Sequence, residues 1–243
     1  RVVPAARIDR ARARLEETRS LIDATTKKYR VQQRFVVALW GIESDFGRAT
    51  GGFPVIDALA TLAFDGRRSA YFRTELMHAL EILDAGHIAP ERMTGSWAGA
   101  MGQGQFMPST FVNFAVDADE DGRRDIWDSR ADVFASMANY LSKLGWRDDQ
   151  TWGRQVRLPP GFDFALTDGK TIRRLGAWQA LGVRRANGDD LPSRQLRAGI
   201  VTPDGEGGPA FLVYDNFRVL LKWNRSIYFA LAVGHLADRI AER

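Results

Sequence analysis

The chain has 243 residues, of which 45% are hydrophobic and 26% are charged, and its formal net charge is +4. This length and apolar content are enough for a substantial core, as one large domain or as a core with smaller lobes. The absence of cysteine excludes disulfides and thiol chemistry, and no apolar run reaches the length of a membrane-spanning helix.

Residues 7–46 are predicted to be helical throughout, and the end of this segment holds a glutamate in apolar surroundings. Apolar residues recur there at steps of three and four, which is typical of one buried helix face: Val31, Phe35, Leu39, Ile42 and Phe46. Glu43 follows Leu39 by four residues and precedes Phe46 by three, so these side chains lie above and below it. Burial favours the neutral form of a carboxyl group, which can act as a general acid. The alternative is a structural carboxylate held by an arginine or by backbone amides.

Further helices are predicted over residues 57–64 and from Ser69 to about Ala85. The segment from Gly95 to Pro108 is rich in glycine, so its backbone can run close to a ligand or to another segment. Its polar residues Ser96 and Gln105 are candidate ligand contacts, although they could equally brace a buried crossing loop. A phosphate-binding loop is a poor interpretation, because the glycine order is wrong and neither a preceding strand nor a lysine is present.

Residues 117–128 have the acidic pattern of an EF-hand calcium loop. Asp117, Asp119 and Asp121 occupy positions one, three and five, and Gly122 occupies position six. Arg123 offers its backbone carbonyl at position seven. Position twelve is Asp128 in place of the usual glutamate. We expect structural calcium here, and the alternative is an acidic solvent loop held by its own arginines.

The rest of the chain changes character twice. A helix is predicted over residues 131–144, and residues 151–214 read as a small β-rich insert with a short helix at 171–181. Strands are expected at 155–158, 162–166 and 211–214, and a long apolar helix at 219–240. The predicted fold class is therefore mainly α with some β (α+β). The expected division is a helical lobe plus core at 1–150, the insert at 151–214 and a C-terminal helix completing the core at 215–243.

Several of these motifs together resemble the lytic murein transglycosylase B family, of membrane-bound and soluble type, in the lysozyme-like superfamily. The resemblance is carried by GIESDFG (residues 41–47), GSWAGAMGQGQFMPSTF (95–111), ANYL (138–141) and KWNRSIYFALAVGHLADRI (222–240). It extends from about residue 30 to residue 243, and only the β-rich insert matches weakly. It implies a lysozyme-like core with an attached helical lobe and a small β-rich insert. It also implies cleavage of the MurNAc–GlcNAc β-1,4 bond of peptidoglycan to leave 1,6-anhydromuramyl ends.

The resemblance also implies roles for individual residues. Glu43 is the sole catalytic residue, acting first as acid and then as base. The glycan groove is lined by Ser96, Gln105, Phe106, Tyr140, Arg68, Trp223 and Asn224, and Asp132 is a candidate for a later calcium ligand. Many relatives carry tyrosine at the positions of Trp223 and Phe229, and Phe229 cannot donate a hydrogen bond.

The expected partners and location follow from the same resemblance. Peptidoglycan strands are the substrate, other cell-wall enzymes are candidate partners, and the chain is expected to be a monomer of the bacterial periplasm or cell envelope. No cofactor is expected for catalysis beyond the structural Ca²⁺. The positive charge is scattered and forms no dense basic run, so nucleic acid is not an expected partner. The alternatives are a hydrolytic muramidase and a non-catalytic peptidoglycan-binding module.

Overall fold

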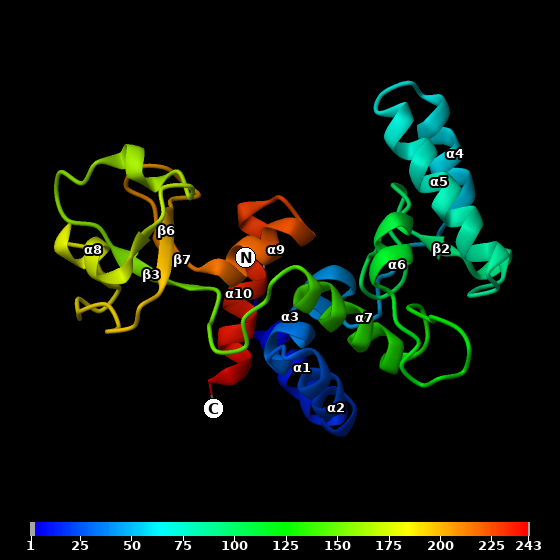
Figure 1. Cartoon of the computed structure of the whole chain (residues 1–243), viewed down its shortest axis with the longest axis horizontal. Coiled ribbons are helices and arrows are strands. Elements are labelled where there is room, and N and C mark those ends of the chain that lie inside the picture. The colour runs from blue at the N-terminus through cyan, green and yellow to red at the C-terminus, as the bar shows by residue number, and fades with distance from the viewer. Residues whose placement is uncertain (1–2, 243) are drawn as a thin grey trace. The chain divides into compact units, whose positions relative to one another are not determined.

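The structure is a computed structural model that describes residues 3–242 (Figure 1). The chain divides into two compact units. The first unit runs up to Lys143 and resumes at His235, and the second comprises Leu144–Gly234. Helices dominate the first unit and a small sheet lies in the second, so the mainly α, α+β expectation is confirmed. The finer division at 1–150, 151–214 and 215–243 stays a prediction.

The described part of the first unit up to Lys143 is built mostly of helices, joined by loops and two very short strands. Its α-helices are α1 (Ala5–Glu17), α2 (Arg19–Tyr29), α3 (Gln33–Ser44), α4 (Val55–Phe64), α5 (Ser69–Asp84), α6 (Pro108–Phe114) and α7 (Arg130–Lys143). A 3₁₀ turn, η1, spans Pro90–Arg92, and the strands are β1 (Phe53–Pro54) and β2 (Thr94–Gly95). The helices predicted near 57–64, 69–85 and 131–144 are thus present.

The prediction that residues 7–46 are helical throughout is wrong at two points, where the helical backbone is interrupted. The hydroxyl of Thr18 donates to the carbonyl of Arg14 at 2.7 Å, where α1 ends. Such a side-chain bond competes with the helical backbone pattern. Arg30 has a left-handed backbone with φ of 54°, which ends α2. The segment therefore consists of three separate helices, α1, α2 and α3.

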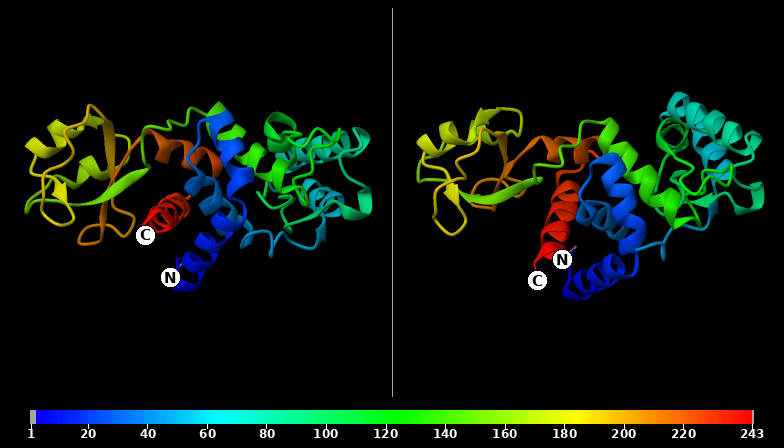
Figure 2. Two further views of the ribbon diagram at one scale, coloured as in Figure 1. Left: turned by 90° about the horizontal axis from the view of Figure 1, so that it is seen from below. Right: turned by 60° about the horizontal axis from the view of Figure 1, so that its bottom comes forward.

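Helix α3 is the buried helix of the first unit. Seven consecutive residues, Phe35 to Gly41, are buried, so the helix is covered on almost every side and not on one face alone. The elements that contact it within the unit include α1, α2 and α7, and the two further views of the ribbon show α1 and α2 beside it (Figure 2). This packing gives the end of α3 a rigid support.

Two contacts place the glycine-rich segment against α4 and α5. Strand β1 pairs with β2, with Phe53 opposite Gly95, so the start of α4 lies beside that segment. At the other end of the segment, the buried carboxylate of Glu75 on α5 accepts hydrogen bonds from the backbone amide and hydroxyl of Ser109, at 2.8 and 2.7 Å. These bonds satisfy an amide at the start of α6 that has no partner within the helix.

The second unit holds a five-stranded antiparallel sheet in the order β4-β6-β7-β3-β5. Its strands are β3 (Gly153–Arg157), β4 (Arg173–Arg174), β5 (Arg184–Arg185), β6 (Arg197–Val201) and β7 (Ala210–Val213). Helix α8 (Leu175–Ala180) contributes Trp178, which is fully buried and donates its indole N–H to the carbonyl of Ala198 at 2.9 Å. This ring packs in one apolar cluster with Ile200 and Leu212 of the sheet. The unit therefore has a core of its own.

Three local predictions for this part of the chain need correction. The apolar run at 162–166 forms no strand, and a 3₁₀ turn, η2 (Phe164–Thr167), begins there, with the carboxylate of Asp163 accepting from the amide of Ala165. The helix expected at 171–181 is shorter, because residues 173–174 form β4. The helix expected at 219–240 is divided into α9 (Asp215–Trp223) and α10 (Ile227–Ala241).

The break between α9 and α10 has a local cause. Asn224 is extended, and its side-chain oxygen accepts from the amide of Ser226 at 3.0 Å, while the hydroxyl of Ser226 accepts from the amide of Phe229. Side chains of this kind stop one helix and cap the next. Within residues 3–242 no helix combines the length and the apolar character needed to cross a bilayer.

Candidate active site

The last turn of α3 carries Glu43, which is half-buried. The chain leaves the helix through Asp45, Phe46 and Gly47, which have left-handed φ values of 47°, 63° and 81°. This turn lays the Phe46 ring back on the helix at Gly41, where an added Cβ would lie 2.6 Å from the ring. Phe46 is only 5% exposed, so the turn that follows Glu43 is anchored by a buried ring.

Gln103 fastens this turn to two other segments. The indole N–H of Trp40 donates to its Oε1 at 2.8 Å, and its own Nε2 donates to the carbonyl of Trp127 at 2.7 Å. The hydroxyl of Ser44, the residue next to Glu43, donates to the Gln103 carbonyl at 2.7 Å. Since Gln103 is also buried, these bonds hold the last turn of α3, the glycine-rich segment and the chain near residue 127 in one arrangement.

Gly47 makes room for Gln103. A Cβ at this position would lie 2.5 Å from the Gln103 Oε1, and the positive φ of Gly47 already disfavours other residues. Its amide donates to the Ser44 hydroxyl at 3.0 Å. Gln103 is absent from the residues that the sequence predicts for the site. The one sequence feature that could have indicated it is its place between two glycines in the glycine-rich segment.

Ser96 and Gln105 both brace the glycine-rich segment. The Ser96 hydroxyl accepts from the amides of Ala98 and Ala100, at 3.3 and 3.0 Å. The Gln105 Nε2 donates to the carbonyls of Thr50 and Gly102, at 3.0 and 2.9 Å. These bonds use neither the Ser96 hydroxyl hydrogen nor the Gln105 Oε1, and both side chains are half-buried. Each can therefore hold the loop and still bind a polar ligand group.

Phe106 and Tyr140 lie in the apolar backing of this segment. Their exposed fractions are 3% and 7%, and their ring centroids are 6.2 Å apart. The Tyr140 ring also packs on Phe114 at 4.7 Å. Burial raises the pKa of Tyr140 to about 12, so its hydroxyl is neutral at physiological pH and can take part only as a hydrogen-bonding group.

Arg68 is not brought beside Ser96. It is exposed in the turn between α4 and α5, and its guanidinium stacks on the rings of Tyr71 and Phe72, at 4.5 and 5.5 Å from their centroids. Helix α4, with ten residues and a length of about 15 Å, separates this turn from the strand β2 that precedes Ser96.

Trp223 and Asn224 belong to the second unit. Trp223 is the last residue of α9 and is half-buried, and Asn224 is exposed, with its side-chain oxygen bonded to the Ser226 amide.

The acidic loop brings three of its predicted metal ligands together. Carboxylate oxygens of Asp117, Asp119 and Asp121 lie within 4.8 Å of one another. The Asp117 Oδ1 is buried and has no hydrogen-bond partner, and an uncompensated buried carboxylate oxygen is costly. A hard divalent cation would satisfy it with oxygen ligands of the preferred kind. The residues present therefore fit a calcium-like ion.

The remaining predicted ligands have other partners. Asp132 is fully buried, and its two oxygens accept the amides of Ala118 and Asp125 at 2.7 and 2.6 Å, which ties both sides of the loop together. Burial raises the pKa of Asp132. Asp128 forms an ion pair with Arg92. The Arg123 side chain pairs with Asp121 at 2.9 Å, and its hydrogen bond to that carboxylate lowers the pKa of Asp121.

Comparison with known proteins gives matches over nearly the whole chain. The family described as "Transglycosylase SLT domain" matches residues 1–238. The membrane-bound lytic murein transglycosylase B of Escherichia coli (strain K12) is 34% identical over 215 residues, which are 88% of this chain and 58% of that protein.

Two solved structures also match nearly the whole chain. SltB3 from Pseudomonas aeruginosa, in complex with NAG-anhNAM-pentapeptide, has a TM-score of 0.96 and 46% identity, over 99% of this chain and 64% of that one. The Escherichia coli lytic transglycosylase Slt35, in complex with calcium, has a TM-score of 0.85 and 29% identity, over 98% and 75% of the two chains. These matches confirm the lysozyme-like fold that the sequence resemblance implies. The chain spans about three fifths of the length of the first two relatives.

Proposed function

This chain belongs to the transglycosylase SLT domain family, and on that premise we propose that it is a peptidoglycan lytic transglycosylase. It cleaves the bond between MurNAc and GlcNAc without water and leaves a 1,6-anhydro end. Among the relatives above, the Escherichia coli (strain K12) protein is a lytic murein transglycosylase by name and Slt35 a lytic transglycosylase. SltB3 binds a NAG-anhNAM-pentapeptide.

The observation that carries the proposal is the support of Glu43. The helix turn that carries Glu43 includes the buried Trp40 and is followed by the buried Phe46. The hydrogen bond from Ser44 to Gln103 joins this turn to the glycine-rich segment. A carboxyl group held rigidly at the edge of an apolar surface is suited to proton transfer, because its geometry needs no reorganisation during the reaction.

Glu43 acts twice in the proposed mechanism. As a carboxylic acid it gives its proton to the glycosidic oxygen while the bond from that oxygen to C1 of MurNAc breaks. As a carboxylate it then takes the proton of the C6 hydroxyl of the same sugar, and the C6 oxygen forms a bond to C1. Glu43 ends protonated as it began, and no water is consumed. The attacking hydroxyl is already tethered to the reacting sugar, which favours this step over attack by free water.

The ion pairs of Asp45 support a mechanism in which Glu43 is the only catalytic carboxyl group. Most glycosidases use two carboxylates, one of which activates water or attacks the sugar. Asp45 is the carboxylate next in sequence, and its oxygens pair with Arg10 at 3.1 Å and Arg48 at 3.5 Å. It is therefore occupied by structural ion pairs, and an internal nucleophile removes the need for a partner of Glu43.

The proposed glycan contacts follow from the available polar groups. Ser96 and Gln105 bind acetamido or hydroxyl groups near the cleaved bond, with the hydroxyl hydrogen and the Oε1 that the loop leaves unused. Phe106 and Tyr140 form the apolar backing. Trp223, Asn224 and Arg68 are further candidate contacts to the glycan.

We expect muropeptides released from purified sacculi to carry 1,6-anhydro ends. A hydrolytic muramidase, the alternative within the same fold, would leave reducing ends heavier by one water. Mass spectrometry of the released fragments separates the two results. A product set made only of reducing ends would contradict the transglycosylase proposal.

The acidic loop is proposed as a structural calcium site. Asp117, Asp119 and Asp121 supply carboxylate oxygens and Arg123 its backbone carbonyl, while Asp132 braces the loop from its buried position. The relative Slt35 is known in complex with calcium, and the unpartnered Asp117 oxygen supports the same kind of ligand here. The ion has no part in the proton transfers, which need no cofactor.

Added Ca²⁺ is expected to raise the melting temperature. At a free concentration of about 100 times the Kd, binding to the folded state alone contributes about 2.7 kcal/mol. A chelator should reverse the gain while activity at low temperature persists. Asp117→Asn should abolish the calcium-dependent shift, and Asp84→Asn, an exposed aspartate elsewhere in the first unit, should retain it. If wild-type protein shows no calcium-dependent shift, the loop binds no calcium.

The proposed location is the bacterial periplasm or cell envelope, where peptidoglycan is found. The relative from Escherichia coli is membrane-bound by name. Peptidoglycan strands are the proposed partner, the protein acts as a monomer, and other cell-wall enzymes are candidates for association.

A further inference from the structure

Four arginines of the second unit, from three strands of its sheet and the loop before β6, lie around one cavity or beside it. Arg174, Arg185 and Arg194 line one cavity of about 950 Å³ together with polar side chains. Arg154, on the adjoining strand β3, donates its Nε–H to the hydroxyl of Tyr214 at 2.8 Å. We refer to these four residues as the arginine cluster.

The buried Tyr214 is influenced by three of the four residues of the arginine cluster. Burial raises the pKa of Tyr214, and the charges of Arg154, Arg185 and Arg194 oppose that rise. Three guanidinium groups thus act on one phenolic oxygen from separate strands and loops. Like charges around one cavity repel one another, and a bound anion reduces that repulsion.

Part of this charge is not neutralised by the protein. Arg194 pairs with Asp149 at 3.2 Å, and Asp190 pairs with Arg184 at 3.3 Å. Among residues 3–242, neither Arg174 nor Arg185 has a carboxylate partner within 4 Å; Arg174 donates only to the neutral Gln195 side chain, at 3.0 Å. Asp189 also lines the cavity, and its carboxylate accepts from Asn187 at 2.7 Å.

Arg185 supplies the observation that points to a ligand. Its Nε is buried and has no hydrogen-bond partner, although a guanidinium presents its N–H groups in a fork that matches a carboxylate. A buried donor without an acceptor is unfavourable, so this nitrogen requires an acceptor from outside the chain. The cavity is large enough for part of a peptide.

We propose that the arginine cluster binds a carboxylate of the peptide attached to the glycan strand, with Arg185 as the principal contact. The inference rests on the proposed function, because the peptide belongs to the proposed substrate. The polar side chains of Gln179, Ser193 and Gln195 line the same cavity and suit the amides of a peptide. The second unit would then select strands that still carry peptides.

Titration calorimetry with GlcNAc-anhydroMurNAc-pentapeptide tests the proposal, because this product is not cleaved further. Arg185→Gln is expected to weaken binding about tenfold or more, since a hydrogen bond to a charged group is lost. A probe whose peptide carboxylates are all converted to amides should bind wild-type protein equally weakly. Arg185→Lys keeps the positive charge but lacks the forked N–H groups of a guanidinium, so its affinity should lie between those of Arg185→Gln and the wild type.

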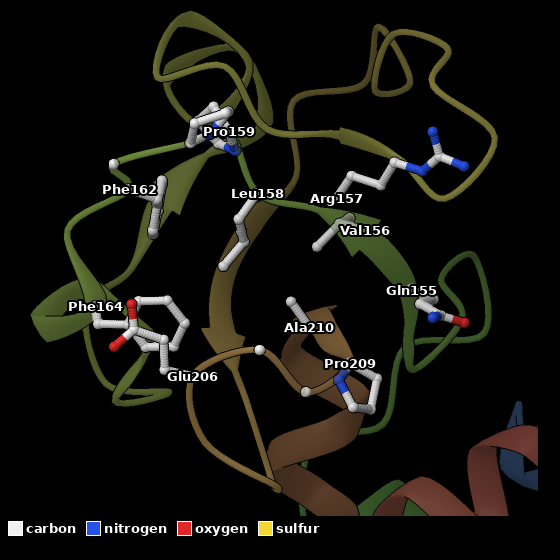
Figure 3. Close-up of a pocket in the computed structure, with 14 residues that line it drawn as sticks. Gln155, Val156, Arg157, Leu158, Pro159, Phe162, Phe164, Glu206, Pro209 and Ala210 are labelled. Atoms are coloured by element: carbon white, nitrogen blue, oxygen red, sulfur yellow. The ribbon is translucent and has the colours of Figure 1, made fainter.

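Two controls separate this loss from general effects. Arg157→Gln removes the same charge from an exposed position on β3, where the side chain points away from Leu158 and Ala210 of a second cavity (Figure 3). It should bind the pentapeptide probe as the wild type does. The peptide-free disaccharide has a free lactyl carboxylate, and Arg185→Gln should not change its binding.

Two results would overturn the assignment: unchanged affinity of Arg185→Gln for the pentapeptide probe, or an equal loss for the peptide-free disaccharide. Cleavage of peptide-free glycan strands is measured in parallel. Arg185→Gln should cleave them at the wild-type rate, so failure of the peptide site and failure of the proposed lytic activity give different results.

Discussion

The Glu43→Gln protein is expected to bind glycan strands and to release no anhydro products. An amide can neither give a proton to the glycosidic oxygen nor take one from the C6 hydroxyl, so both steps fail together. A single general acid or base contributes about 10²–10⁴-fold to a rate, and the loss here should reach at least the upper part of that range. The measurement is the release of soluble muropeptides from sacculi, with binding followed by co-sedimentation.

Asp45→Asn is the matched control for this substitution. It removes a carboxylate two residues away on the same turn, and asparagine tolerates the left-handed backbone of that position. Its ion pairs with Arg10 and Arg48 are partly exposed, so their loss should cost at most about 1 kcal/mol of stability. We expect most of the activity to remain. If Glu43→Gln retained wild-type turnover, Glu43 would not be the catalytic acid and base, and a wild-type protein that bound glycan but released no products would favour the non-catalytic interpretation. If Asp45→Asn abolished activity, a two-carboxylate mechanism would take the place of the one proposed.

Sequence patterns predicted the helices that have strong apolar periodicity. The helix over 69–85 and the one over 131–144 appear as α5 and α7 with nearly the expected bounds. Helix ends set by single residues were not predictable, because Thr18 and Asn224 act through local hydrogen bonds and Arg30 through its left-handed backbone. The period of α3 indicated one buried face, whereas Val36, Val37 and Ala38 are buried as well.

In the candidate site, contacts between segments that are distant in the sequence were likewise not predictable. The motif containing Glu43 and the glycine-rich segment were both evident, because each is continuous in sequence. The contact that joins them was not, since Trp40 and Gln103 are 63 residues apart. Likewise the spacing of the acidic loop indicated which residues are acidic, but not that both oxygens of Asp132 are taken by backbone amides.

The second large effect is expected for Gln103→Ala. The substitution removes the acceptor of the buried Trp40 indole N–H and the donor to the Trp127 carbonyl. Each buried polar group left without a partner costs about 1–3 kcal/mol, so the free energy of unfolding of the first unit should fall by about 2–4 kcal/mol. Chemical denaturation monitored by tryptophan fluorescence measures it, and Gln155→Ala, an exposed glutamine on β3, is the matched control with no expected change.

The same substitution should also lower kcat at a temperature where the variant is still folded. The Ser44 bond goes to the Gln103 backbone and survives, but the loop that supplies this carbonyl is no longer anchored to Trp40 and Trp127. A misplacement of about 1 Å at a reacting group can cost about 100-fold in rate, so we expect a loss of about tenfold or more in kcat, with KM little changed. Gln103→Glu keeps the acceptor for Trp40 but has no N–H for Trp127, and it should lose activity as well. If both variants were less stable but turned over substrate at the wild-type kcat, Gln103 would be a structural residue alone, and the placement of Glu43 would depend on the packing of α3.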